Sequence, residues 1–435
     1  MSRALRLFRA GCVLALLSPV PAMAQDVPLS QLLVQLIQAD IRLEPPPAGS
    51  GFPSHEAHFL PGVDQTLAPF LFNQQLVGQL ATFPIGSPTG GFAFTFDAAS
   101  GTFQRTTDSF GPAFADRSLT NGRGKFTVGT NFQYSKYSSF EGKQLDDGIK
   151  FYLSHQDLPG ELFFEGDVIE ASLRADISSA TTTIFGNYGI TDKLDLAVAI
   201  PIVSVQMDAT VDANIIRLGS GQETTNLHFF PGGSASKSFA SAGDAAGIGD
   251  VLLRAKYRFA SMAGGGLAAG IDLRLPTGDA DNLLGTGAAG ATLTLIGSTT
   301  RGKLGPHFNI GYTASGESDI VNIPNEFNYR FGTEYVATPR MTLNADLLGR
   351  TLMDAGRLEL QSVTRRFASA AGVAGSRTFD EYVARSGSLN LLNLALGGKF
   401  NVGGNFLLNA NVLFAVNNAG VIARFTPVIG FDYTF

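Results

Sequence analysis

The segment Asp250–Phe259, which reads DVLLRAKYRF, decides the fold. In an extended strand, successive side chains point to opposite faces, so Arg254, Lys256 and Arg258 share one face. The other face carries Val251, Leu253, Ala255, Tyr257 and Phe259. Three cations cannot face hydrocarbon, where each costs about 2–4 kcal/mol at mid-depth. The segment therefore predicts a membrane-spanning strand with an apolar outer face and a charged inner face.

The same alternation recurs along residues 269–275, 343–350 and 406–416, always with apolar side chains on one face. We expect the charged face of these strands to line a lumen. The predicted lumen-lining charges are Arg254, Lys256, Arg258, Asp272, Arg274, Arg330, Glu334, Asp346, Arg350, Lys399 and Arg424. Two interpretations stay open: a mutually neutralising network that stiffens the barrel, or a weak electrostatic filter for solutes.

Connections between the alternating segments are short and long in turn. Short turns lie near residues 191–193, 261–265, 301–303, 338–340 and 401–404. Between them lie 140–165, 216–246, 277–288, 315–325 and 351–387, with a brief connection at 417–420. Eleven connections imply twelve strands, and an even number is usual for a bacterial single-chain barrel. The sequence thus predicts an all-β fold, a transmembrane antiparallel β-barrel of about twelve strands over residues 123–435.

The last strand ends on an alternating aromatic pattern. Phe431, Tyr433 and Phe435 share one face with Phe425 and Ile429, and Phe435 is the final residue. Such a terminal strand resembles the signal read by the outer-membrane assembly machinery. We therefore expect a Gram-negative outer-membrane location, with outer-membrane lipid, lipopolysaccharide and the assembly machinery as partners.

The first residues have the three parts of a secretory signal peptide. Arg3, Arg6 and Arg9 precede an apolar run over 12–17 and the small residues at 22–24. The apolar run is too short to span a bilayer, although a retained N-terminal anchor is the alternative. We expect residues 1–24 to be removed. Cys12, the single cysteine, would leave with them, so disulfides and thiolate sites are excluded.

Charge and motif content exclude several functions. The formal charge of −6 becomes −9 when the three leader arginines leave, and no basic cluster exceeds Arg365-Arg366, so nucleic acid is not expected as a partner. An outer-membrane phospholipase is the enzymatic rival. Its histidine would have to face lipid, whereas His307 falls on the lumen face, and no Gly-x-Ser-x-Gly elbow exists. The nearest candidate for a metal, His55 with His58, lacks a second ligand pair. We expect no catalytic residues, metal or cofactor.

Residues 25–122 do not follow the barrel pattern. Leu29, Leu32, Leu33, Leu36 and Ile37 have helical spacing and precede three prolines at 45–47, so one short helix is predicted. The rest is rich in Pro, Gly and Phe. Because a structureless linker contains few aromatics, we expect a mostly irregular plug in the lumen, or a periplasmic segment. The candidate hydrophobic gate comprises Phe92, Phe94, Phe96, Phe103, Phe110 and Phe114.

Several stretches resemble an outer-membrane family named for the meta pathway of phenol degradation, also called SphA-like transporters. These stretches are residues 109–112 with 117–120, 188–196 with Ile200-Pro201, 247–251 and 273–279. The similarity covers about residues 105–435. It implies an outer-membrane protein that admits hydrophobic, including aromatic, compounds, with a distant likeness to long-chain fatty-acid transporters. It implies no catalysis.

Function is expected to follow from passage through the barrel. The chain has no phosphate-binding Gly-Lys-Ser/Thr loop, so uptake of small hydrophobic solutes would be passive. The alternative is a structural or surface-interaction barrel without transport, which would bind a partner through the loops near 216–246 and 351–387.

Overall fold

The computed structural model describes residues 27–45, 63–87, 91–97, 99–154, 167–218, 228–262, 264–320, 322–368 and 374–435. The predicted signal peptide, His55, His58 and His155 lie outside them. Within these ranges, twelve strands form a closed antiparallel ring. They are β3 (Phe126–Phe140), β6 (Val168–Gly189), β7 (Leu194–Ile216), β9 (Val251–Met262), β10 (Gly265–Leu275), β11 (Gly290–Ser298), β12 (Leu304–Ser315), β13 (Glu326–Thr338), β14 (Met341–Leu352), β17 (Leu389–Gly403), β18 (Phe406–Ala415) and β20 (Phe425–Thr434).

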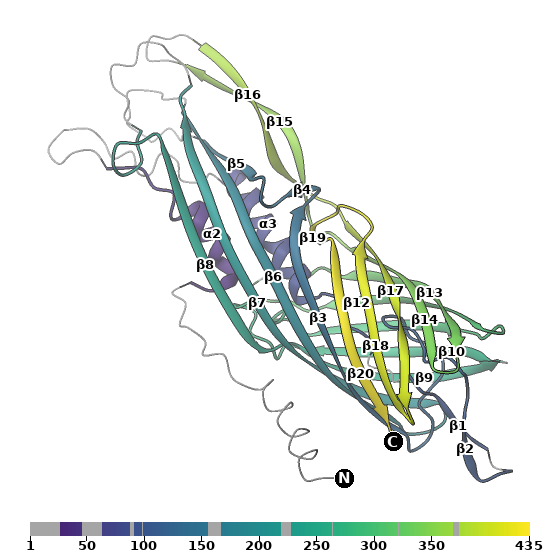
Figure 1. Ribbon diagram of the computed structural model, residues 1–435. Coiled ribbons are helices and arrows are strands. Elements are labelled where there is room, and N and C mark those ends of the chain that lie inside the picture. Colours follow the sequence, from purple (N-terminus) through teal and green to yellow (C-terminus); the bar gives the residue numbers. More distant parts are fainter. Residues whose placement is uncertain are drawn as a thin grey trace, which may run out of the picture.

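The ring closes because β3 pairs with β20 on one edge and with β6 on the other. Phe431 lies opposite Thr130, and Thr130 lies opposite Ile184. The predicted twelve-stranded barrel is therefore confirmed. The tight connections and the C-terminus lie at one end of the barrel, which we call the short-turn end, and the longer connections lie at the other, the long-loop end (Figure 1).

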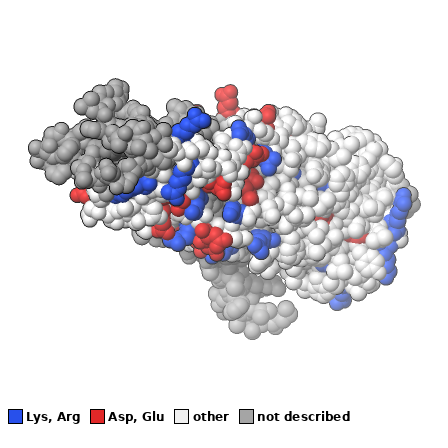
Figure 2. Space-filling model, turned by 90° about the horizontal axis from the view of Figure 1, so that it is seen from above, with Lys and Arg blue, Asp and Glu red and all other residues white. Residues whose placement is uncertain are grey.

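Large apolar side chains cover the outside of the barrel. On β3 the exposed residues are Phe126, Val128, Phe132 and Tyr134, and the next outward residue is Lys136. Their inward neighbours Thr127, Asn131 and Gln133 are buried and polar. Figure 2 shows this outer surface as a broad band nearly free of charge, with charged side chains gathered on either side of it. This is the outer surface of a transmembrane barrel, apolar toward lipid and polar toward the lumen.

One side of the barrel rises far beyond the rest at the long-loop end. β6 and β7 have 22 and 23 residues. Four further strands pair there with the ring: β4 (Lys143–Gln144), β5 (Ile149–Ser154), β8 (Ser236–Ile248) and β19 (Val421–Ala423). The prediction of a loop over 216–246 was therefore wrong from Ser236 onward. The exposed residues of β8, such as Ser238 and Ala240, are not large apolar side chains, so the strand lacks the alternation that predicted the others. The reason is that the extension lies beyond the apolar outer surface and carries polar pairs such as Arg174 with Asp212.

Two helices pack against the inner face of this extension (Figure 1). The predicted helix is confirmed as α2 (Leu29–Gln38). A second helix, α3 (Val63–Ala81), corrects the expectation of an otherwise irregular segment. Its buried residues Phe72, Leu76 and Leu80 have helical spacing, but Pro69 inside the helix obscured the pattern. The largest apolar core lies between these helices and the extension, away from the polar lumen.

Two hairpins stand apart from the ring. β1 (Phe94–Asp97) and β2 (Thr102–Arg105) project at the short-turn end, and β15 (Arg357–Ala368) and β16 (Ala374–Arg385) project at the long-loop end (Figure 1). The predicted connection over 351–387 thus contains a hairpin. Neither of the described helices is long and apolar enough to cross a bilayer.

Candidate functional site

The lumen is filled by a segment of the chain's own N-terminal region, Ser109–Gly122, which we call the plug. All of its residues are buried except Ala113, which is half-buried. Gly122 ends the plug with a φ of +95°, and a Cβ there would lie 2.5 Å from the carbonyl oxygen of Phe94. The turn that leads from the plug toward β3 therefore requires glycine at this position.

Side chains of the barrel wall satisfy the plug's main chain. The amides of Phe110 and Asp116 donate to Thr342 Oγ1 at 3.1 Å and to Asn309 Oδ1 at 2.7 Å. Arg330 in turn donates to the carbonyl of Phe114 at 2.7 Å. A buried irregular segment has no strand ladder to join, so the wall must supply its hydrogen-bond partners. The polar inner face of the barrel does this.

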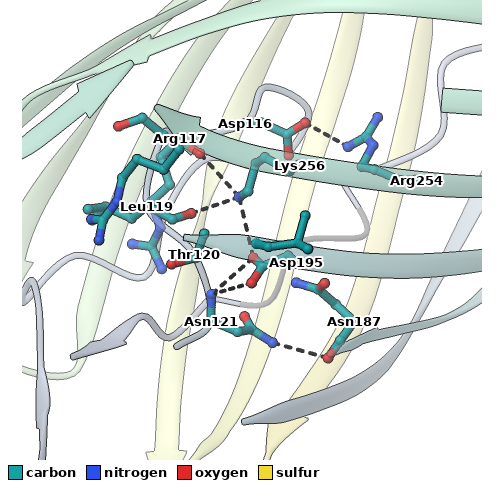
Figure 3. Close-up of polar contacts among 12 residues, drawn as sticks. Asp116, Arg117, Leu119, Thr120, Asn121, Asn187, Asp195, Arg254 and Lys256 are labelled. Atoms are coloured by element: carbon teal, nitrogen blue, oxygen red, sulfur yellow. Dashed lines mark hydrogen bonds and ion pairs between the residues drawn. The ribbon is translucent and has the colours of Figure 1, made fainter. Parts of the chain in front are cut away.

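Lys256 is the most enclosed cation of the lumen, with 1% of its surface exposed. Its ammonium donates to the carbonyls of Leu119 at 2.7 Å and Arg117 at 3.3 Å, and lies 3.8 Å from Asp195 (Figure 3). Asp195 also accepts from the amide of Asn121 at 3.0 Å. Figure 3 shows these groups converging from β7, β9 and the plug, so one charge pair fixes the plug to the wall.

A second charge pair joins the plug to the wall at Asp116, just before the plug residues that Lys256 and Asp195 contact. Asp116 lies 2.6 Å from Arg254 Nη1 (Figure 3). The Arg254 guanidinium also makes a bidentate contact with Asp272 on the next strand. A bidentate pair fixes the plane of the guanidinium, which in turn fixes the position of Asp116.

His307 is fully enclosed between two carboxylates of neighbouring strands. Its Nε2 lies 2.7 Å from Asp346, and its Nδ1 lies 3.3 Å from Glu334 and 3.1 Å from the carbonyl of Gly305. Asp346 also accepts from the amide of Phe114 at 3.3 Å. This cluster therefore belongs to the polar network that holds the plug, and both ring nitrogens have protein partners.

Ten of the eleven predicted charges face the lumen, and Lys256, Glu334, Asp346, Arg350 and Lys399 are buried there. The prediction for Arg424 was wrong: its side chain is exposed. It lies between β19 and β20, where a break in the strand interrupts the alternation of inward and outward side chains. Asp116 and Asp195 were missed. Asp195 has an inward position in the alternation of β7, which was a usable signal, whereas Asp116 lies in the irregular plug and had none.

The predicted phenylalanine gate does not form one cluster. Phe92 and Phe110 pack on each other and on Leu407, with Phe94 beside them. Phe114 packs elsewhere in the lumen, against residues of β14, β17, β18 and β20. Phe96 and Phe103 are exposed on the hairpin at the short-turn end. The six phenylalanines therefore divide between two separate buried clusters in the lumen and the exposed hairpin of β1 and β2.

A chamber lies between α3, the plug and the wall strands β9 to β14. Its non-protein space is about 1700 Å³, including open solvent. The charged residues that line it are Arg254, Arg274, Arg330, Arg350, Asp116, Asp272 and Glu326. Smaller polar side chains of β11 and β12 and apolar residues such as Leu252 and Leu348 complete the lining. The chamber can thus contact both apolar and polar parts of a small molecule.

Asp250 positions the loop over 276–289, which borders the chamber. Its carboxylate accepts from the amide of Gly278 at 3.1 Å and from the amide and hydroxyl of Thr286 at 2.9 and 2.6 Å. Thr286 itself lines the chamber. Since Asp250 lies where β8 bends into β9, one side chain couples the bend to the loop over 276–289.

The sequence resemblance is confirmed by a family model. The family described as "Putative MetA-pathway of phenol degradation" matches residues 169–356, which include the bend at Asp250 and the chamber wall from β9 to β14. No curated protein sequence is significantly similar to this chain.

Three of the solved structures that align with this chain are similar to it at low sequence identity. A COG4313 outer membrane channel from Pseudomonas putida F1 is 13% identical, with 73% of this chain and 98% of that chain covered and a TM-score of 0.43. The P. putida toluene transporter TodX is 12% identical, with 82% and 99% covered and a TM-score of 0.32. The Ralstonia pickettii toluene transporter TbuX is 11% identical, with 82% and 99% covered and a TM-score of 0.30.

Proposed function

We propose that the chain is an outer-membrane channel for passive uptake of small hydrophobic solutes, aromatic compounds included. The observation that carries this proposal is the chamber inside a closed transmembrane barrel, separated from the short-turn end by the protein's own plug. The family description names phenol degradation, a pathway with aromatic substrates. Its match spans the strands that form the chamber wall.

The placement in the membrane follows from the two ends of the barrel. Outer-membrane barrels put short turns in the periplasm and long loops outside. The long-loop end, with α2, α3 and the strand extension, would then face the medium, and the hairpin of β1 and β2 would face the periplasm. A solute would enter the chamber from outside and leave past the plug.

Passage requires the plug to shift. The described plug residues are held by hydrogen bonds and ion pairs of the kind made by Lys256 and Arg254. Such contacts can open without breaking a covalent bond, because water can replace the wall as the hydrogen-bond partner of the plug. The plug therefore acts as a gate rather than a permanent seal.

A catalytic role is not part of the proposal. The phospholipase alternative needs a histidine that activates a nucleophile. In this structure the nitrogens of His307 contact Asp346, Glu334 and the Gly305 carbonyl. Those contacts support a structural role in the lumen.

Outer-membrane assembly and lipid contact complete the proposal. Phe431, Tyr433 and Phe435 are exposed on one face of β20, and Phe435 stacks on Phe126 of the neighbouring strand at a ring distance of 6.1 Å. These side chains are available to the assembly machinery before closure and to outer-membrane lipid, including lipopolysaccharide, afterwards.

The test is the initial rate of uptake of radiolabelled toluene by Gram-negative cells. Cells that express the full chain should take up the probe faster than cells carrying the empty vector, and the rate should not depend on an energy source. Equal rates in both cells, with the protein present in the outer membrane, would contradict transport and favour the structural or surface-interaction barrel.

A further inference from the structure

Arg274 and Arg330 differ from the other two cations of the chamber, Arg254 and Arg350, in lacking a carboxylate partner within the part of the chain that the structure describes. Asp116 and Asp272 are paired with Arg254, and Glu326 is paired with Arg350 at 2.6 Å. Among the described residues, no carboxylate lies within 4 Å of Arg274 or Arg330. Four arginines against three acidic residues therefore leave the chamber with a positive excess located on these two side chains.

The hydrogen bonding of Arg274 is incomplete. Its Nη1 donates to the carbonyl of Ala81, the last residue of α3, at 3.1 Å. The carbonyls at a helix C-terminus carry partial negative charge, so this contact holds the side chain in place. A guanidinium has five N–H donors, and Arg274 is only half-buried beside the chamber. Its remaining donors are accessible from the chamber.

A recess lined mostly by apolar residues, and by no residue of the plug, adjoins Arg274. Its apolar lining comprises Leu80, Ala81, Phe83, Ile85, Pro201, Val203, Leu252, Leu283 and Leu284. Its polar lining comprises Arg274, Gln133, Thr181 and Asp250, whose carboxylate oxygens accept hydrogen bonds from Gly278 and Thr286. Phe83, Ile85, Leu252 and Arg274 line the recess and the chamber together. Arg330 does not border the recess; it lies lower, against the plug carbonyl of Phe114. Arg274 therefore stands where an apolar surface meets a polar one.

We propose that the recess and Arg274 form a binding site for an aromatic carboxylate, with the ring in the recess and the carboxylate on the Arg274 guanidinium. The planar fork of a guanidinium matches a carboxylate, and a charge-assisted pair in a partly dry site is strong. This inference rests on the proposed channel function and deepens it: the solute favoured by the site is an amphipathic aromatic acid rather than a pure hydrocarbon.

The test is the binding of benzoate to the refolded full-length chain, compared with its neutral isostere benzamide and the cation benzamidine. Benzoate should bind more tightly than benzamide, and benzamidine should bind most weakly. Arg274→Gln should weaken benzoate by about tenfold or more and leave benzamide nearly unchanged, because only the charged pair is lost. The matched control is Arg174→Gln, which removes an arginine that pairs with Asp212 outside the chamber. It should change the affinity for neither benzoate nor benzamide.

A purely structural role of Arg274 predicts a different pattern. If the residue only caps α3, Arg274→Gln would weaken benzoate and benzamide equally, and that result would overturn the proposal. Should this variant fail to fold, Arg274→Lys keeps the charge and should retain the preference for benzoate, whereas Leu252→Asn should weaken both aromatic ligands alike. Equal binding of benzoate and benzamide to the unaltered chain would also overturn it.

Failure of this inference can be separated from failure of the channel. If cells take up radiolabelled toluene but the purified protein does not prefer benzoate, the proposed channel function stands and the carboxylate site is refuted. If cells take up neither toluene nor benzoate but the purified protein binds benzoate through Arg274, the channel function is refuted and the carboxylate site is supported.

Discussion

Lys256 illustrates what a single side chain contributes to the closed lumen. Its ammonium bonds two plug carbonyls and approaches Asp195. A hydrogen bond to a charged group contributes about 1.5–3 kcal/mol. Lys256→Met should therefore loosen the plug, and amide hydrogen exchange at residues 117–122 should become about tenfold faster or more. Lys193→Met, at an exposed turn, is the control; unchanged exchange in Lys256→Met would show that the pair does not hold the plug.

Asp250 provides a second prediction at the scale of one residue. Asp250→Asn replaces one acceptor oxygen by a donor, which leaves Gly278 or Thr286 without its present partner. We expect a loss of about 1–3 kcal/mol of local stability. Proteolytic cleavage within 276–289 should become faster. Asp279→Asn, which affects an exposed carboxylate of the same loop, should not accelerate cleavage; equal rates in the two variants would contradict the assigned role.

Residue positions in strands were predictable, but their partners were not. Period-two alternation placed Arg254 and Arg274 in the lumen, because a strand has only two faces. It could not distinguish the paired Arg254 from the unpaired Arg274. That difference depends on Asp116 in the irregular plug and on the neighbours set by barrel closure.

At the scale of elements, α3 is the clearest departure from the sequence prediction. Its buried residues have helical spacing, but Pro69 and the surrounding Pro/Gly-rich sequence favoured an irregular segment. The helix is stabilised by its contact with the strand extension rather than by local propensity. Packing on β5 and β16 is a tertiary effect, and the sequence of the helix alone does not contain it.

This dependence on packing predicts a contrast within the helix. Leu76 is fully buried and Phe70 is 45% exposed. Leu76→Ala should destabilise the helical region by about 2–5 kcal/mol, since it creates a cavity. Phe70→Ala should cost less than about 1 kcal/mol. Hydrogen exchange in α3 measures both, and a larger effect of Phe70→Ala would refute the described packing.

The terminal strand carries a prediction about assembly. Phe435→Ser should reduce the amount of folded protein in the outer membrane of cells, because it removes the terminal aromatic residue, which directly follows β20. Refolding of the purified chain into detergent should change little, since Phe435 is 61% exposed. A matched variant, Phe425→Ser, alters an equally exposed aromatic at the far end of the strand and should assemble better. Equal assembly of both variants would argue against the terminal signal.

For the whole molecule, counting turns and loops predicted the barrel but not the path of the N-terminal region. Strand number follows from connection lengths, which are local in sequence. The region before β3 was expected either in the lumen or in the periplasm. The segment Ser109–Gly122 does lie in the lumen, but α2 and α3 lie at the long-loop end and β1 and β2 at the short-turn end, which the sequence did not predict (Figure 1). This path depends on contacts with segments distant in sequence, such as the hydrogen bond from the amide of Ser30 to the carbonyl of Asp281 in the loop over 276–289.

The central claim, that the plug must move for a solute to pass, can be tested by locking it. Ser118 and Ser298 have hydroxyl oxygens 2.8 Å apart, one on the plug and one on β11. Ser118→Cys with Ser298→Cys should form a disulfide in the oxidising periplasm. Radiolabelled toluene uptake by these cells should fall to the vector level and return when a reductant is added, while each single variant stays active. Uptake that is equal with and without reductant, once the disulfide is shown to form, would contradict the account.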